Sequence, residues 1–150
     1  LDHHLDLAPL VVSVEQAVAA PYVSGRLADA MREELNPVWL APGPDRAAIL
    51  EIALDMADTL GPEVYVRQAR ALQRARDQQA VLRKCKVPTL VMCGEVGRLN
   101  PVKRHSFMAE LLPYAILRVI EGAGHLPTLE QPEATTAAIK EWLKMPLTPA

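Results

Sequence analysis

Two short apolar runs constrain the fold of this chain more than any other feature. Val87–Gly94 reads VPTLVMCG and Ala115–Gly122 reads AILRVIEG, with a predicted helix over about Val102–Leu112 between them. A strand that is apolar without alternation is typical of a parallel sheet covered by helices on both faces. A last helix is predicted from Pro132, because proline is favoured in the first turn of a helix. The order strand, helix, strand, helix predicts an α/β fold containing a right-handed βαβα unit.

The part of the chain before these strands is interpreted as mainly helical. Apolar residues recur at helical spacing over about Arg46–Leu60 and predict a helix there. A second helix with a basic, exposed face is predicted over about Glu63–Arg83. Leu10–Val14 is a β-branched run that favours a strand, although the next residues would equally suit a helix. We therefore divide the chain into residues 1–86 and residues 87–150.

The composition excludes several classes of protein. Half of the 150 residues are hydrophobic and the net charge is −2, which argues against disorder. With 16 basic and 18 acidic residues, the chain has no basic excess for binding nucleic acid. No apolar run approaches the ~20 residues of a membrane span, and the first residues, LDHHLDLAPL, lack the features of a signal peptide. We expect a cytoplasmic protein with neither nucleic acid nor membrane as a partner.

The cysteines and the first histidines give no indication of a metal or another cofactor. Cys85 and Cys93 are too few for a disulfide scaffold and match no zinc spacing. Cys93 ends an apolar strand, which predicts a thiol packed in the core rather than a nucleophile. His3 and His4 lie near acidic residues, but adjacent histidines near a chain end seldom bind a metal. No cofactor is therefore expected.

His125 is the first candidate for chemistry. It lies in the loop GAGHLPTLEQ that follows the second predicted strand, and α/β proteins bind ligands at the carboxyl ends of their strands. A histidine there suits a general base near neutral pH, although one histidine in a glycine-rich loop also suits a surface role. His105, beside Lys103 and Arg104 on a predicted helix, is expected to face solvent.

Longer motifs around these elements resemble a known family. VPTLVMCGEVGRLNP and LPYAILRVIEGAGHLPTLEQPE, followed by an amphipathic helix ending in EWL, resemble the C-terminal part of the α/β-hydrolase family. The preceding LGPEVYVRQARALQRARDQQAVL resembles the helical cap segment of one branch of that family. The resemblance implies an α/β-hydrolase fold whose C-terminal part and cap segment are present. It also implies that His125 is the histidine of a catalytic triad.

The nucleophile of that triad has no counterpart in the sequence. The family places it on a strand-to-helix turn with the pattern G-x-S-x-G. The three serines, Ser13, Ser24 and Ser106, lie in the contexts VVSVE, YVSGR and RHSFM, and no cysteine or aspartate takes the serine's place in such a pattern. The first half of the family's sheet is therefore missing from these 150 residues.

The acid of the triad is altered as well. Family members typically read like G-E-D-D-R-L-T-P at the end of the first of these strands, and the fourth residue is the aspartate. Here the stretch is GEVGRLNP, so Gly97 occupies the place of the acid. Glu95, two residues earlier, is the candidate replacement. Some family members carry the acid after an earlier strand, so Asp45, Asp55 and Asp58 stay open.

Two functional interpretations follow. In the first, the complete protein hydrolyses a small ester, lactone or related acyl substrate, and this chain supplies the histidine. In the second, the chain is a non-catalytic remnant that acts as an oligomeric binding or interaction module. Two parallel strands also need neighbours. A homodimer would supply them through paired edges or exchanged helices, and Leu10–Val14 as a third strand is the alternative.

Overall fold

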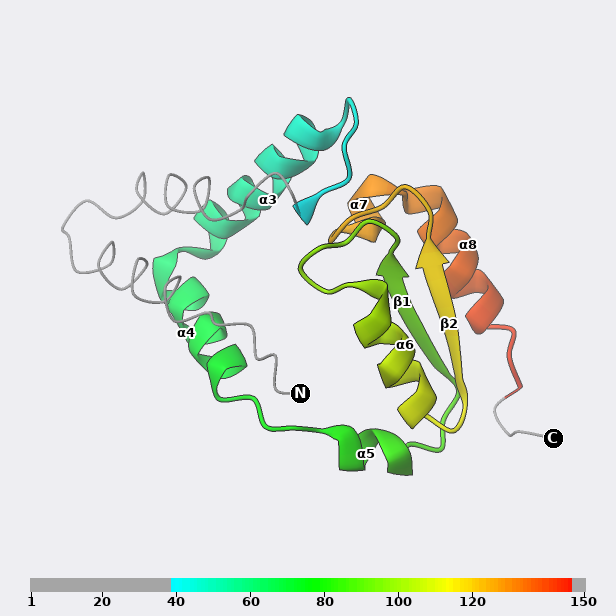
Figure 1. Cartoon of the computed structure of the whole chain (residues 1–150). Helices are drawn as coiled ribbons and strands as arrows, with labels where there is room; N and C mark the ends of the chain where they lie inside the picture. Colours follow the sequence, from blue (N-terminus) through cyan, green and yellow to red (C-terminus); the bar gives the residue numbers. More distant parts are fainter. Residues whose placement is uncertain (1–38, 147–150) are drawn as a thin grey trace. The chain divides into compact units, whose positions relative to one another are not determined.

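The computed structural model describes residues 39–146 of the chain (Figure 1). They belong to two compact units, whose described parts are residues 50–76 and residues 39–49 together with 77–146. The helices and strands, in chain order, are α3 (Arg46–Leu60), α4 (Pro62–Gln73), α5 (Gln79–Lys84), β1 (Thr89–Gly94), α6 (Val102–Leu111), β2 (Ala115–Ile120), α7 (Pro127–Glu130) and α8 (Pro132–Trp142). The second unit contains the sheet of β1 and β2 together with α5, α6, α7 and α8.

The predicted strands form a parallel pair. β1 and β2 run in register from Thr89 opposite Ala115 to Gly94 opposite Ile120, with α6 as the connection between them. The ladder begins at Thr89, whose amide donates to the carbonyl of Tyr114 at 2.8 Å. Pro88, just before it, has no amide hydrogen to give to a ladder. The predicted α/β fold with parallel strands is thus confirmed.

Helices cover the two faces of this pair. Successive side chains of a strand point to opposite faces. Met92 packs on a buried cluster of Ile120, Ala123 and Ala138, the last of which lies on α8. Val91 and Cys93 point to the other face and are only 5% and 4% exposed. α6 packs against both strands, and Figure 1 shows it and α8 on opposite sides of them.

Polar contacts tie α8 to the sheet. Arg118 of β2 donates from Nε to Oε2 of Glu141 at 3.0 Å, and its Nη2 donates to Oε1. This hydrogen-bonded partner lowers the pKa of Glu141. Because both side chains are exposed, the pair adds little to stability. The indole of Trp142 donates to the carbonyl of Pro88 at 3.1 Å and so joins the end of α8 to the start of β1.

The helical part differs from its prediction in one place. α3 has the predicted bounds, and it ends at Gly61, whose φ of 80° takes the chain out of the helix. The single helix predicted over about Glu63–Arg83 is wrong, because α4 ends at Gln73 and α5 begins at Gln79. Between them, Oδ1 of Asp77 accepts a hydrogen bond from the amide of Gln79 at 2.9 Å. A short carboxylate that bonds local amides starts a new helix rather than continuing one.

The two units also divide the chain differently from the boundary predicted between residues 86 and 87. Residues 39–49 and 77–86 group with the sheet. Their placement has a physical reason, because α5 packs against α6 and the backbone of Trp39 and Ala41 bonds to the loop after β2. Leu10–Val14, His3 and His4 lie outside the described residues. None of the helices in residues 39–146 is long and apolar enough to cross a membrane.

Candidate active site

The loop after β2 passes directly over the end of β1. Gly122 turns the chain at the end of β2 with a φ of 66°. A Cβ added to Gly94 would overlap the carbonyl of Gly124 and lie 2.6 Å from the carbonyl carbon of Ala123. Only a glycine at the end of β1 therefore lets the loop come so near. This contact places His125 at the carboxyl edge of the two strands.

Three consecutive amides fix the backbone at His125. The amide of His125 donates to the carbonyl of Trp39 at 2.7 Å. The amide of Gly124 donates to Oε1 of Glu130 at 3.0 Å, and the amide of Leu126 donates to Oε2 at 2.8 Å. The amide of Ala41 donates to Oε1 of the same carboxylate at 2.5 Å. One side chain thus joins both neighbours of His125 to the segment of residues 39–41.

The structure adds Glu130 to the residues predicted from the sequence. Residues 122–131 were expected to form a loop, and that expectation is wrong in part because α7 lies within them. Pro127 occupies the first turn of α7, where its missing amide hydrogen costs nothing. The Glu130 carboxylate accepts a hydrogen bond from the amide of Leu126, the residue just before α7. Leu126 has no side chain that could cap the helix, so the sequence carried no capping-box signal for this contact.

The imidazole of His125 is half-buried and its pKa lies below the ordinary value. Burial is the main cause of the lowered pKa, the nearby charge of His105 lowers it further, and the carboxylate of Glu130 acts in the opposite direction. His105, expected to face solvent, is also half-buried, and its Nδ1 lies 3.3 Å from the carbonyl oxygen of Pro101. The ring of Trp39 meets the imidazole edge-on, with centroids 6.2 Å apart. The lowered pKa favours the neutral form of the ring, which is the form a general base needs.

We expect NMR titration of the chain to place the pKa of His125 below ~6.5, the ordinary value for histidine. The unfolded chain then takes up the proton first. The free energy of unfolding should be highest above pH ~6.5 and should fall as the pH drops from there through the pKa of the folded state. His105→Gln should raise the pKa of His125, because it removes a repelling charge. A pKa of His125 above the ordinary value would contradict this picture.

Glu95 and Gly97 occupy different places relative to His125. Glu95 is exposed, and its Oε2 accepts a hydrogen bond from the amide of Gly122 at 3.2 Å. Within residues 39–146 no hydrogen bond joins Glu95 to His125. Gly97 is buried, and a Cβ there would lie 3.3 Å from the carbonyl oxygen of Gly124. The backbone thus brings Gly97 against the residue that precedes His125, and the role of Glu95 as the acid stays a prediction.

The other candidates from the sequence are Cys93, three serines and three aspartates. Cys93 is buried, and desolvation raises the pKa of its thiol, which agrees with the predicted core thiol. Ser106 lies within α6 and not on a turn after a strand. Asp45, Asp55 and Asp58 are exposed, and a role for one of them as the acid stays a prediction. Ser13 and Ser24 lie outside residues 39–146.

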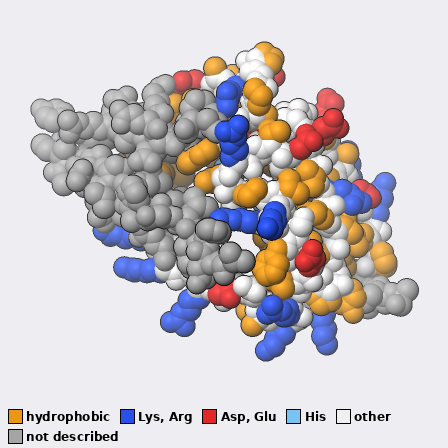
Figure 2. All heavy atoms as spheres, in the orientation of Figure 1, with side chains coloured by type: hydrophobic (Ala, Val, Ile, Leu, Met, Phe, Trp, Pro, Cys, Tyr) orange, Lys and Arg blue, Asp and Glu red, His pale blue; other side chains and the backbone are white. Residues whose placement is uncertain are grey.

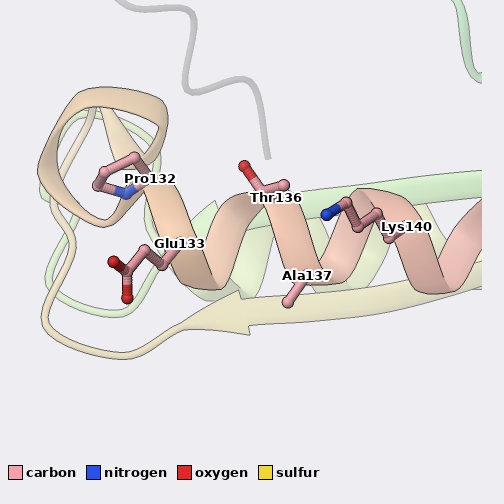
Figure 3. Close-up of a pocket in the computed structure, with 5 residues that line it drawn as sticks. All are labelled: Pro132, Glu133, Thr136, Ala137 and Lys140. Carbon is pink, nitrogen blue, oxygen red and sulfur yellow. The ribbon is translucent and has the colours of Figure 1, made fainter.

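Two features of the described residues bear on ligand binding. In the part of the chain that the structure describes, no three histidine, cysteine or acidic side chains come close enough to hold a metal ion. A shallow groove runs along α8 (Figure 3), and its lining residues are Pro132, Glu133, Thr136, Ala137 and Lys140. The lining includes none of the residues around His125.

Comparison with known proteins assigns the chain to a protein family. Residues 4–139 match the sequence profile of the alpha/beta hydrolase family. Since the match covers most of the 150 residues, the chain belongs to the alpha/beta hydrolase family. A search of the curated protein sequences found no match.

Solved structures of similar fold include esterases and a lactonase. A thermophilic esterase from Thermogutta terrifontis is 28% identical with a TM-score of 0.73, and the match covers 88% of this chain and 47% of the esterase. The enol-lactonase from Burkholderia xenovorans LB400 is 22% identical with a TM-score of 0.67, and the match covers 93% of this chain and 50% of the lactonase. The esterase EaEST from Exiguobacterium antarcticum is 20% identical with a TM-score of 0.65, and the match covers 89% of this chain and 47% of the esterase. The last two matches bear on the fold alone. The chain spans about half the length of these structures, which confirms the predicted partial α/β-hydrolase fold.

Proposed function

We propose that the complete protein hydrolyses a small ester, a lactone or a related acyl substrate, with His125 as its general base. The observation that carries the proposal is the backbone at His125, held by three consecutive amide hydrogen bonds at the carboxyl edge of two parallel strands. The similarity to an esterase from Thermogutta terrifontis supports the substrate class. The similarity to an enol-lactonase supports the fold that such a reaction would use.

His125 has two roles in this reaction, first as a general base and then as a general acid. As a neutral ring, it takes the proton from a nucleophile's hydroxyl group while that oxygen attacks the carbonyl carbon of the substrate. As an imidazolium, it then gives the proton to the oxygen that leaves. The lowered pKa favours the first step, because the base is unprotonated at neutral pH. The nucleophile must come from outside these 150 residues, because they contain no G-x-S-x-G pattern.

The test compares this chain with a longer product of the same gene. The coding sequence before Leu1 is determined and expressed together with the 150 residues. We expect a G-x-S-x-G pattern in it and hydrolysis of p-nitrophenyl acetate and of a small lactone by the longer protein. The 150-residue chain alone should show no turnover above background. Turnover by the short chain, or a longer protein without a nucleophile motif and without activity, would overturn the proposal.

Gly97→Asp in the longer protein should raise the activity. A Cβ at residue 97 needs a shift of only a few tenths of an ångström in the Gly124 carbonyl, and the carboxylate then starts beside the His125 loop. A carboxylate there would orient the imidazole and stabilise its protonated form. The rate of p-nitrophenyl acetate hydrolysis measures the gain, with Glu95→Gln as the companion variant. No gain from Gly97→Asp together with a loss from Glu95→Gln would assign the role to Glu95.

The second candidate function is an oligomeric interaction module, and the exposed apolar surface favours it. Val119 is 42% exposed although it lies in a strand. Figure 2 shows hydrophobic side chains exposed among basic ones on the described surface. The large apolar side chains exposed in the second unit are Val81, Val87, Val96, Phe107, Val119, Leu129, Ile139 and Leu143. Within residues 39–146 the sheet has only these two strands, and open strand edges and apolar surface favour pairing with another chain.

We expect a homodimer of the 150-residue chain at micromolar concentration, because twofold closure is the commonest way to cover such a surface. Analytical ultracentrifugation gives the mass directly. A specific interface would bury on the order of 800 Å² on each partner. A monodisperse monomer that unfolds cooperatively would refute the dimer.

A further inference from the structure

We propose that Glu130 is the positioning residue of His125, acting through the backbone on both sides of the histidine rather than through its ring. The proposal rests on the function proposed above, because positioning has a catalytic meaning only if His125 is the base. The contacts themselves belong to the chain and can be measured without any catalysis.

The first argument is that three backbone amides donate hydrogen bonds to the single carboxylate of Glu130. Oε1 of Glu130 accepts from the amides of Ala41 and Gly124, at 2.5 Å and 3.0 Å. Oε2 accepts from the amide of Leu126 at 2.8 Å. Charged acceptors make stronger hydrogen bonds to amides than neutral ones do. Three amides from two distant segments therefore depend on a single side chain.

The second argument is where these amides lie. The Leu126 amide belongs to the peptide plane that follows His125, and the Gly124 amide to the plane between Ala123 and Gly124, so the two hydrogen bonds restrain the loop just before and just after the histidine. Ala41 lies two residues after Trp39, whose carbonyl accepts from the amide of His125 and whose ring meets the imidazole. Glu130 thus holds the loop and also the segment against which the loop rests.

The third argument is the ring itself. Within residues 39–146 no hydrogen bond holds the imidazole of His125, and Gly97 stands where an acid would orient it. The ring is therefore placed by its backbone and by the edge of Trp39. The charge of Glu130 also favours the protonated imidazole, which is the form that appears during the reaction.

The test uses Glu130→Gln and Glu130→Asp in the 150-residue chain, with Glu133→Gln as the matched control on α8. Glutamine keeps one acceptor oxygen. We expect it to turn that oxygen toward Ala41 and Gly124, which leaves its NH₂ group facing the amide of Leu126. Hydrogen exchange of the Leu126 amide should then become about tenfold faster, the change expected for one lost hydrogen bond. The Ala41 and Gly124 amides should stay more protected than that of Leu126.

The pKa of His125, measured by titration, distinguishes an effect of Glu130 on the histidine from a general loss of stability. In Glu130→Gln the pKa of His125 should fall further, because the attracting charge is gone. In Glu130→Asp the charge remains but the shorter side chain does not reach all three amides. That variant should lose amide protection at Gly124 and Leu126 while keeping the His125 pKa near that of the unchanged chain.

Glu133→Gln should leave both readouts unchanged, since Glu133 is exposed on α8. Full protection of Leu126 in both Glu130 variants, or an unchanged pKa of His125 in Glu130→Gln, would overturn the proposal. If circular dichroism shows that Glu130→Gln does not fold, the amide exchange rates of Glu130→Asp alone test whether Glu130 holds the backbone at His125. If the longer protein hydrolyses no ester, the proposed function is wrong, but the exchange rates and the pKa still show whether Glu130 holds the backbone at His125.

Discussion

Alanine in place of His125 should lower kcat/KM for p-nitrophenyl acetate by about 10⁴-fold in the longer protein, the scale of losing one member of a catalytic triad. Under the proposed function the imidazole of His125 takes the proton from the nucleophile, and the alanine variant lacks that imidazole. The loss should appear in kcat rather than in KM, because the proton moves only during the chemical steps.

The matched control for this prediction is His105→Gln. Its side chain lies on α6 with Nδ1 3.3 Å from the carbonyl oxygen of Pro101, and its charge lowers the pKa of His125. We expect its kcat/KM to stay within a few-fold of the unchanged protein. Its pH–rate profile should shift toward higher pH as the pKa of His125 rises. Equal losses in the two histidine variants would contradict the assignment of His125 as the base.

The strands could be predicted from the sequence because their patterns are local. Val87–Gly94 is apolar at almost every position, which is typical of a strand covered on both faces, and β1 occupies residues 89–94. The position of His125 followed from the order of elements, since the loop after a parallel strand lies at its carboxyl edge. The strands were predicted from the apolar pattern, and the position of His125 was predicted from the order of the elements.

Glu130 and residues 39–41 could not be found in the same way. The contact of Ala41 with Glu130 joins residues 89 positions apart in the chain, and no periodicity extends over that distance. The break between α4 and α5 was missed for another reason. Aspartate occurs both within helices and at their starts, and the hydrogen bond from the Gln79 amide to Asp77, which accompanies the break, cannot be read from periodicity.

Gly124→Ala should lower the free energy of unfolding of the sheet-containing unit by about 3 kcal/mol, through overpacking and lost hydrogen bonds. A Cβ at residue 124 would overlap the carbonyl oxygen of Trp39 and lie 2.7 Å from the amide nitrogen of Ala41. Both are backbone atoms, so no rotamer change relieves the overlap. The segment of residues 39–41 must move away from the loop.

That movement has a specific consequence. The carbonyl of Trp39 leaves the amide of His125, and the amide of Ala41 leaves Glu130, so two of the contacts that join the loop to this segment are lost together. Urea denaturation followed by amide signals of β1 and β2 measures the loss of stability. Hydrogen exchange of the His125 amide reports the lost contact with Trp39.

Gly43→Ala is the matched control, because Gly43 lies two residues after Ala41 and a Cβ there meets no atom within 4 Å. The same change of residue type should alter the free energy of unfolding by less than about 1 kcal/mol, since only the conformational freedom of the unfolded chain is affected. A loss in Gly124→Ala no larger than in Gly43→Ala would mean that residues 39–41 do not press on the loop. His125 would then depend for its backbone position on Glu130 alone.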